Sequence, residues 1–179
     1  MMEMCCRYDK LRGRFAMWYG CGQWCVATSE DGLVFSNITL QYSRYGSSDS
    51  TDGTGVFIDD DGTGYVIFSS PNHNHSVSIE RLSADYLSST HQLIATLPDT
   101  MVESPSLFRR NGIYYATYGS CCCACRAGSG QVVNWALSPA GPWKRQMPHP
   151  DINCVDATTQ ICGEYGPSAS KPHFCCCFD

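Results

Sequence analysis

Residues 57–68 have the sequence Phe-Ile-Asp-Asp-Asp-Gly-Thr-Gly-Tyr-Val-Ile-Phe, and near copies of this stretch occupy residues 8–20 and 108–119. Each copy consists of a strand that ends in an aromatic residue, a polar turn with glycine, and an aromatic-rich strand. A hairpin repeated at about this period is typical of a β-propeller, whose blades are four-stranded sheets arranged around an axis. The turn glycines, Gly13, Gly62 and Gly112, are 49 and 50 residues apart.

Each hairpin is followed by a second segment, at residues 25–35, 77–87 and 132–143. These segments alternate apolar and polar residues and then turn, as half-buried strands do. No long segment has the helical period, so we expect little helix. The sequence therefore predicts an all-β fold, a partial β-propeller over residues 1–147 with about three blades.

Propellers close with four or more blades, so we expect the chain to be a fragment, an incomplete gene product or a degenerate relative. From about residue 148 the repeat gives way to Pro, Asp, Cys and Gly. We expect residues 148–179 to form a Cys-rich irregular tail, either disordered or mis-read sequence.

The composition limits the possible partners. The chain has 179 residues, of which 43% are hydrophobic and 16% charged, which suits one globular unit with a core. A net charge of −5 and a pI of 5.4 argue against nucleic-acid binding, because phosphates need a basic surface. No apolar run is long enough to span a membrane. We expect a monomer that binds neither nucleic acid nor a membrane.

The chain contains 13 cysteines, more than a cytosolic protein usually carries. Two Asn-X-Ser/Thr triplets, at Asn37 and Asn74, fit a secreted chain, although such triplets also occur by chance. No signal-peptide core follows Met1, so we expect a secreted protein whose true N-terminus is missing. The odd number leaves at least one thiol without a disulfide partner, and the pairing does not follow from the sequence.

Two clusters invite a metal interpretation. The acidic run 59–62, Asp-Asp-Asp-Gly, lacks the alternating spacing of a calcium loop and instead predicts a hairpin turn. The cluster Cys121–Cys125 is tighter than a zinc site requires and favours disulfides. We expect His73 and His75, on a polar loop, to be solvated. The sequence thus predicts neither a metal nor a cofactor.

Three carboxylates stand five residues before the aromatic residue that opens each repeat: Glu3, Asp52 and Glu103. In a propeller this position lies on the innermost strand and faces the mouth of the central channel. Convergent carboxylates shift each other's proton affinity, as acid–base cleavage of a glycosidic bond requires. Alternatively they are ordinary polar residues at strand starts, since the chain has 17 acids.

Residues 103–115, Glu-Ser-Pro-Ser-Leu-Phe-Arg-Arg-Asn-Gly-Ile-Tyr-Tyr, resemble the general-acid segment of glycoside hydrolase family 43. There a Glu-X-Pro precedes an aromatic residue, a basic pair, Asn-Gly and Tyr-Tyr. The exo-β-1,3-galactanase branch is the most similar, and the resemblance covers roughly residues 3–145. Further similar segments are 56–70, 14–19, 26–32 and 138–143.

The resemblance implies a five-bladed propeller that hydrolyses glycosidic bonds with inversion. It makes Glu103 the general acid. It also makes Asp52 the second acid, which tunes and orients, although the family usually has this acid four residues before the aromatic. Glu3 corresponds to a substrate-recognition glutamate. The usual base belongs to a blade that this chain lacks; the galactanase branch uses a glutamine instead, for which Gln160 is the candidate.

Trp24 lies between Cys21 and Cys25, which suggests a loop. Trp24, like Trp18 and Tyr19, could stack on a sugar or belong to the blade core. We take Trp24 as a candidate substrate-binding residue.

These observations favour a secreted glycosidase that acts on the O-glycosidic bonds of a plant or algal polysaccharide or oligosaccharide, of β-1,3-galactan or arabinan type. A non-catalytic carbohydrate-binding propeller is the main alternative. A truncated product that does not fold alone is the other, because unpaired sheet edges promote aggregation.

Overall fold

The computed structural model describes residues 4–48, 51–120 and 132–146, with the side chains of residues 52 and 120 excepted. The boundary expected at residue 147, and the expected Cys-rich tail, lie outside these residues. Within the described residues the only helical element is a 3-10 turn, η1 (Pro71–His73), and no helix is long and apolar enough to cross a membrane.

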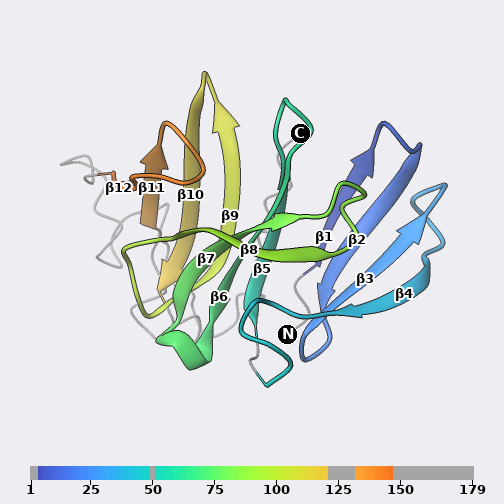
Figure 1. The fold of residues 1–179 in the computed structure, drawn as a ribbon, viewed down its shortest axis with the longest axis horizontal. Coiled ribbons are helices and arrows are strands. Elements are labelled where there is room, and N and C mark those ends of the chain that lie inside the picture. Colours follow the sequence, from blue (N-terminus) through green and yellow to red (C-terminus); the bar gives the residue numbers. More distant parts are fainter. Residues whose placement is uncertain (1–3, 49–50, 121–131, 147–179) are drawn as a thin grey trace, which may run out of the picture.

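In the described part of the chain, twelve strands form three four-stranded sheets in which strands adjacent in sequence pair antiparallel (Figure 1). We call the sheets the first blade (β1–β4), the second blade (β5–β8) and the third blade (β9–β12). The predicted all-β partial propeller of three blades is thus confirmed. The strands are β1 (Met4–Asp9), β2 (Arg14–Gly20), β3 (Trp24–Ser29), β4 (Ser36–Gln41), β5 (Asp52–Ile58), β6 (Gly64–Ser70), β7 (Ser76–Leu82), β8 (Ser89–Thr96), β9 (Val102–Arg110), β10 (Ile113–Ser120), β11 (Val132–Ala136) and β12 (Lys144–Arg145).

The repeated stretch forms the first hairpin of every blade. Its opening aromatic residue pairs across the hairpin with a second aromatic residue. The second blade has one more residue between the two paired aromatics than the other two blades. The three cross-strand pairs are Tyr8–Phe15, Phe57–Tyr65 and Phe108–Tyr115, with ring centroids 4.8, 6.3 and 5.2 Å apart. Such pairs stabilise a hairpin and fix its register.

The acidic run forms a turn, as predicted. The Asp59 amide donates to the Thr63 carbonyl, and the Gly62 amide donates to the Asp59 carbonyl, both at 2.9 Å. Gly62 has φ of 82°, a conformation that glycine adopts at little cost.

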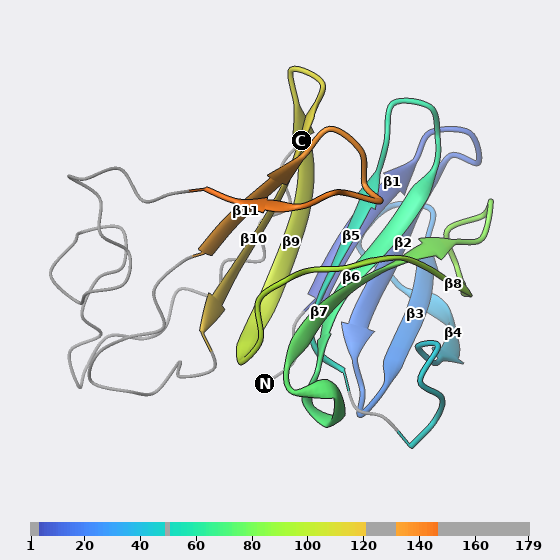
Figure 2. The ribbon, with the colours of Figure 1, turned by 60° about the vertical axis from the view of Figure 1, so that its left-hand side comes forward.

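Strand β6 is buried along its whole length and packs on both faces. Val66 and Phe68 belong to the apolar cluster shared with the first blade. Tyr65 and Ile67 belong to the cluster shared with the third blade. Successive side chains of a strand point to opposite faces, so the second blade lies between the other two (Figure 2).

The innermost strands β1, β5 and β9 contact one another in that order. Gly55 lies at the closest approach of β5 to β9, where a Cβ atom would be 2.8 Å from the Pro105 carbonyl oxygen and 3.0 Å from Ile67 Cγ2. Only a residue without a side chain fits at this point.

A polar cluster joins the second and third blades at the hairpin end. Arg109 Nη1 lies 3.0 Å from carboxylate oxygens of both Asp59 and Asp60. The Tyr114 hydroxyl donates to the buried Asp59 carboxylate. Burial, together with this hydrogen bond, raises the pKa of Tyr114 to about 12.

Replacing Gly55 by Ala should lower the free energy of unfolding by about 1–3 kcal/mol, because the new methyl group collides with backbone. Gly20→Ala is the matched control, because a Cβ there has nothing within 4 Å and the change should stay within about 0.5 kcal/mol. Urea unfolding measures both. Equal stabilities would contradict the close approach of β5 and β9.

Replacing Tyr114 by Phe should cost about 1–3 kcal/mol at neutral pH, because the buried Asp59 carboxylate loses a donor. The folded chain keeps the Tyr114 proton to about pH 12, whereas the unfolded chain releases it near 10. As the pH rises from about 10 to about 12, the wild type therefore loses the stability that the Tyr114 hydroxyl contributes. The difference in free energy of unfolding between wild type and variant should narrow over this pH range. Urea unfolding over this pH range measures the difference. Tyr115→Phe, at a half-buried ring, is the control. A difference in free energy of unfolding that does not change with pH would contradict the raised pKa of Tyr114.

Candidate active site

The candidate site starts from β5, where a β-bulge follows Asp52 directly. Asp52 pairs with Ser69 and Thr54 pairs with Phe68, so Gly53 is the extra residue. Gly53 has φ of 68°, which glycine tolerates. A bulge bends its strand and changes the direction of the adjacent side chains. Only the backbone of Asp52 is described here.

Strand β9 has the corresponding irregularity after Glu103. Glu103 pairs with Gly119 and Ser106 pairs with Thr117, so the register shifts between these two pairs. Ser104, directly after Glu103, has φ of 55°. A non-glycine residue in this region is uncommon and often accompanies a functional site.

The two acids therefore occupy equivalent places in the repeat. Their partners Ser69 and Gly119 are one repeat apart, and each acid precedes a residue with positive φ. Both lie at the start of an innermost strand, at the end of the blades opposite the hairpin turns (Figure 1). The structure thus brings Asp52 and Glu103 to the same end of neighbouring inner strands.

The turn after β6 holds the backbone segment that directly precedes Glu103. The Asn74 carbonyl accepts a hydrogen bond from the Met101 amide at 3.0 Å, and the His75 carbonyl accepts one from the Val102 amide at 3.2 Å. Asn74, His75 and Met101 all have positive φ, at 58°, 47° and 55°. The backbone just before Glu103 is thus held by two hydrogen bonds in an uncommon conformation.

The same turn also supports the connection that leads to Asp52. Asn72 Nδ2 donates to the Ser48 carbonyl at 3.4 Å, and the His73 ring stacks on Tyr45 with centroids 3.7 Å apart. His73 is exposed and His75 half-buried, so the expected solvated loop is in part a packed one. One turn of the second blade thus holds the segments before both acids.

A second anchor holds the connection between β8 and β9. The Asp99 carboxylate accepts hydrogen bonds from the Tyr118 hydroxyl at 2.6 Å and from Asn134 Nδ2 at 2.8 Å, and it pairs with Arg145 at 3.3 Å. Burial and the Asp99 hydrogen bond raise the pKa of Tyr118, so its hydroxyl remains a donor. These contacts fix the chain four residues before Glu103.

The prediction for Trp24 needs correction. Trp24 is the first residue of β3, not part of a loop, and none of its surface is exposed. Its indole packs edge-on against Trp18 and Phe68, and Nε1 donates to Thr54 Oγ1 at 3.0 Å. No ring face is open to a sugar. Trp24 instead ties the first blade to the strand that carries Asp52.

The other predicted residues are placed as follows. Glu103 is half-buried in β9. Glu3, Gln160 and the cluster Cys121–Cys125 lie outside the described residues. Cys21 and Cys25 are disulfide-bonded around the β2–β3 turn, with Cα atoms 5.8 Å apart.

Sequence reasoning missed the supporting residues. The polar run from Asn72 to His75 was visible as a loop, but its contacts with residues 48 and 101–102 are not local. Asp99 had no distinguishing pattern. Its spacing four residues before Glu103 is the only signal that could have drawn attention to it.

Comparisons with solved structures agree with this fold. The chain is similar to an exo-β-1,3-galactanase from Phanerochaete chrysosporium bound to galactose, at 20% identity over 80% of this chain and 34% of that one, with a TM-score of 0.65. It is similar to an endo-1,4-β-xylanase from Bacteroides thetaiotaomicron, at 25% identity over 82% of this chain and 53% of that one, with a TM-score of 0.70.

An exo-β-1,3-galactanase from Clostridium thermocellum is also similar, at 22% identity over 81% of this chain and 35% of that one, with a TM-score of 0.66. The chain thus spans between a third and just over half of the length of these three structures. No curated protein sequence matched the chain.

The sequence profile of glycosyl hydrolases family 43 matches residues 13–163, which include both acids and extend past the boundary expected at residue 147. The match covers most of the chain and agrees with the propeller fold and with the galactanases among the similar structures. The chain therefore belongs to glycosyl hydrolase family 43.

Proposed function

We propose that this protein is a glycosidase that cleaves O-glycosidic bonds of a polysaccharide or oligosaccharide by an inverting mechanism, with Glu103 as general acid. The observation that carries the proposal is the equivalent placement of Asp52 and Glu103 on neighbouring inner strands, each directly before a residue with positive φ. Two carboxyl groups that flank a scissile bond are what most glycosidases use.

Glu103 has the role of donating a proton to the leaving glycosidic oxygen. It must hold that proton until the substrate is bound. A nearby ionised carboxylate favours the protonated form of its neighbour, which is the role we assign to Asp52. The turn after β6 holds the segments before both residues, and the Asp99 contacts hold the segment before Glu103 a second time. These contacts support an acid that is positioned before the substrate arrives.

Inversion also needs a base that activates water on the opposite face of the sugar. The resemblance to the galactanase branch makes Gln160 the candidate for this position and Glu3 a substrate-recognition residue. The proposed enzyme uses no cofactor and no metal.

The relatives favour a galactan as substrate. One of them contains galactose, and a form with one glutamate replaced by glutamine contains β-1,3-galactotriose. Another is described as a β-1,3-galactosidase. We therefore place β-1,3-galactan first and an arabinan second, as plant or algal side chains.

We further propose that the protein is secreted and acts as a monomer with disulfide bonds. The cysteine content and the Cys21–Cys25 bond support this environment.

Replacing Glu103 by Gln should lower kcat about 10²–10⁴-fold, because the amide cannot protonate the leaving oxygen. The measurement is reducing-sugar release from β-1,3-galactan, arabinan and xylan by the full chain. Aryl glycosides with good leaving groups need less acid assistance, so the loss on them should be smaller. Unchanged turnover on the polysaccharide would contradict the role of Glu103.

Glu30→Gln is the matched control, because Glu30 is exposed at the hairpin end of the first blade and its replacement should leave turnover unchanged. Equal unfolding curves for both variants would exclude misfolding. A folded wild type that binds galactan without cleaving it would be a carbohydrate-binding propeller, and the hydrolase proposal would fail.

A further inference from the structure

The outermost strand of the first blade exposes apolar side chains among polar ones. All residues of β4 except the last are exposed, among them Ile38 at 64% and Leu40 at 50%. Leu33 and Val34, in the turn before it, are 85% and 72% exposed. A strand edge with apolar side chains pairs readily with other chains and is usually protected.

The corresponding strand of the second blade has a different surface. The exposed residues at the start of β8 are Thr90, His91 and Gln92, which are polar. β4 differs in that the exposed apolar side chains Ile38 and Leu40 alternate with polar ones along the strand. A group that covers these two side chains would reduce pairing of this edge with other chains.

An Asn-X-Thr triplet, Asn37-Ile38-Thr39, lies within this edge. In β4 the residues Asn37 and Ile38 are both opposite Ala27, because Val26 pairs with Thr39 and Thr28 with Ser36. This bulge gives Asn37 a φ of 54°. Its side chain is exposed, and Nδ2 donates to Thr28 Oγ1 at 3.3 Å.

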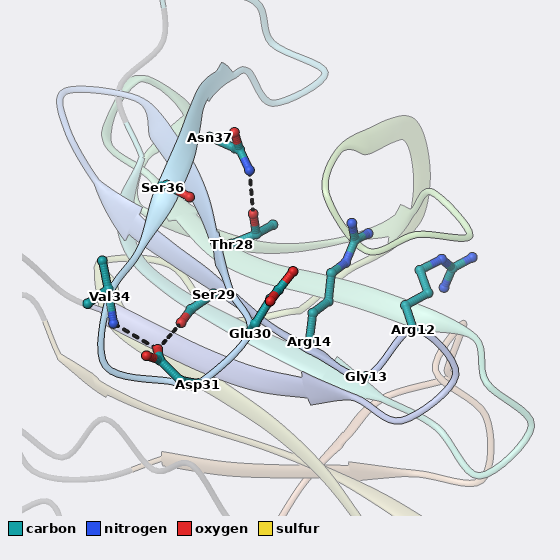
Figure 3. A pocket seen from close by; sticks show the side chains of 10 residues that line it. All are labelled: Arg12, Gly13, Arg14, Thr28, Ser29, Glu30, Asp31, Val34, Ser36 and Asn37. Carbon is teal, nitrogen blue, oxygen red and sulfur yellow. Dashed lines mark hydrogen bonds between the residues drawn. The ribbon is translucent and has the colours of Figure 1, made fainter.

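A polar groove of about 800 Å³ begins at Asn37 (Figure 3). Its lining includes hydroxyl, carboxylate and guanidinium groups, which are suitable partners for sugar hydroxyls. A volume of this size accommodates a small saccharide. The polar residues that line it are Arg12, Arg14, Thr28, Ser29, Glu30, Asp31, Ser36 and Asn37.

The wall of the groove is held by Asp31. Its carboxylate accepts hydrogen bonds from the amides of Leu33 and Val34 and from the Ser29 hydroxyl. The two amides in particular lower the pKa of Asp31 to about 2. Arg12 and Arg14 are also engaged, with the Asp9 carboxylate and the Asp85 carbonyl, each through one guanidinium nitrogen.

We propose that Asn37 is an N-glycosylation site whose inner sugars lie in this groove and cover the apolar edge of β4. In the modification, Asn37 Nδ2 attacks C1 of a lipid-pyrophosphate-linked oligosaccharide. A new N–C1 bond forms, the C1–O bond to the pyrophosphate breaks, the lipid pyrophosphate leaves, and one amide proton is released. The remaining N–H can still donate to Thr28 Oγ1.

The modification of Asn37 does not require hydrolase activity, but its choice over the second triplet rests on the proposed site at Glu103. The inference applies to the chain as it passes through a eukaryotic secretory pathway. The second triplet, Asn74-His75-Ser76, is a useful comparison. Asn74 is also exposed, but its backbone belongs to the turn that holds the segment before Glu103. A glycan there would crowd the proposed site, so we assign the modification to Asn37.

Secretory expression of the full chain in a eukaryotic host tests the assignment. Release with peptide N-glycosidase in ¹⁸O water, followed by peptide mass spectrometry, should label Asn37. The label and one glycan should be lost in Asn37→Gln and in Thr39→Ala, and kept in Thr39→Ser, which retains the hydroxyl. An unlabelled Asn37 in the wild type, or a glycan that persists in both loss variants, would overturn the proposal.

Light scattering tests the covering role. Complete removal of the glycan under native conditions should increase aggregation several-fold, and Ile38→Lys should suppress that increase. Trimming to a single sugar should leave aggregation low, because the innermost sugar stays in the groove next to β4. Equal scattering with and without the glycan would refute the covering role, and a trimmed protein that aggregates like the bare one would refute the placement in the groove.

Discussion

The burial of β6 on both faces is the interaction on which the rest of the structure depends. Val66 and Phe68 pack toward the first blade, while Tyr65 and Ile67 pack toward the third. Each large side chain buried in this way contributes about 1.5–3 kcal/mol. Because both faces of one strand are occupied, the neighbouring blades are oriented relative to each other through the second blade, and the inner strands are brought together.

That convergence sets the geometry of the chemical site. The inner strands β5 and β9 approach so closely that Gly55 has room for no side chain. Residues with positive φ after both acids turn the backbone at equivalent points. The turn after β6 and the Asp99 cluster then hold the segments that lead into these strands. The hydrophobic core places the strands, and polar contacts at their ends fix the acids.

The outer strands are under different constraints. They lie away from the inner strands and are largely exposed, and their surfaces differ between blades: the exposed start of β8 is polar, whereas β4 also exposes Ile38 and Leu40 and contains an Asn-X-Thr triplet. The outer strands can therefore differ in sequence without changing the inner strands. How an outer strand is protected against pairing with other chains also differs between the first and second blades.

The sequence by itself determined the hairpins and the equivalence of Asp52 and Glu103, because cross-strand pairing and turns are local and repeat with the chain. The Asp59–Gly62 turn was predicted for the same reason. Only the tertiary structure decided the place of Trp24 and the supporting role of Asp99 and the turn at residues 72–75. The partners of Asp99 are Tyr118, Asn134 and Arg145, which lie 19, 35 and 46 residues away in the chain. Trp24 donates a hydrogen bond to Thr54 in the neighbouring blade. An alternating pattern shows that one face of a strand is buried, but it does not say which other sheet covers that face.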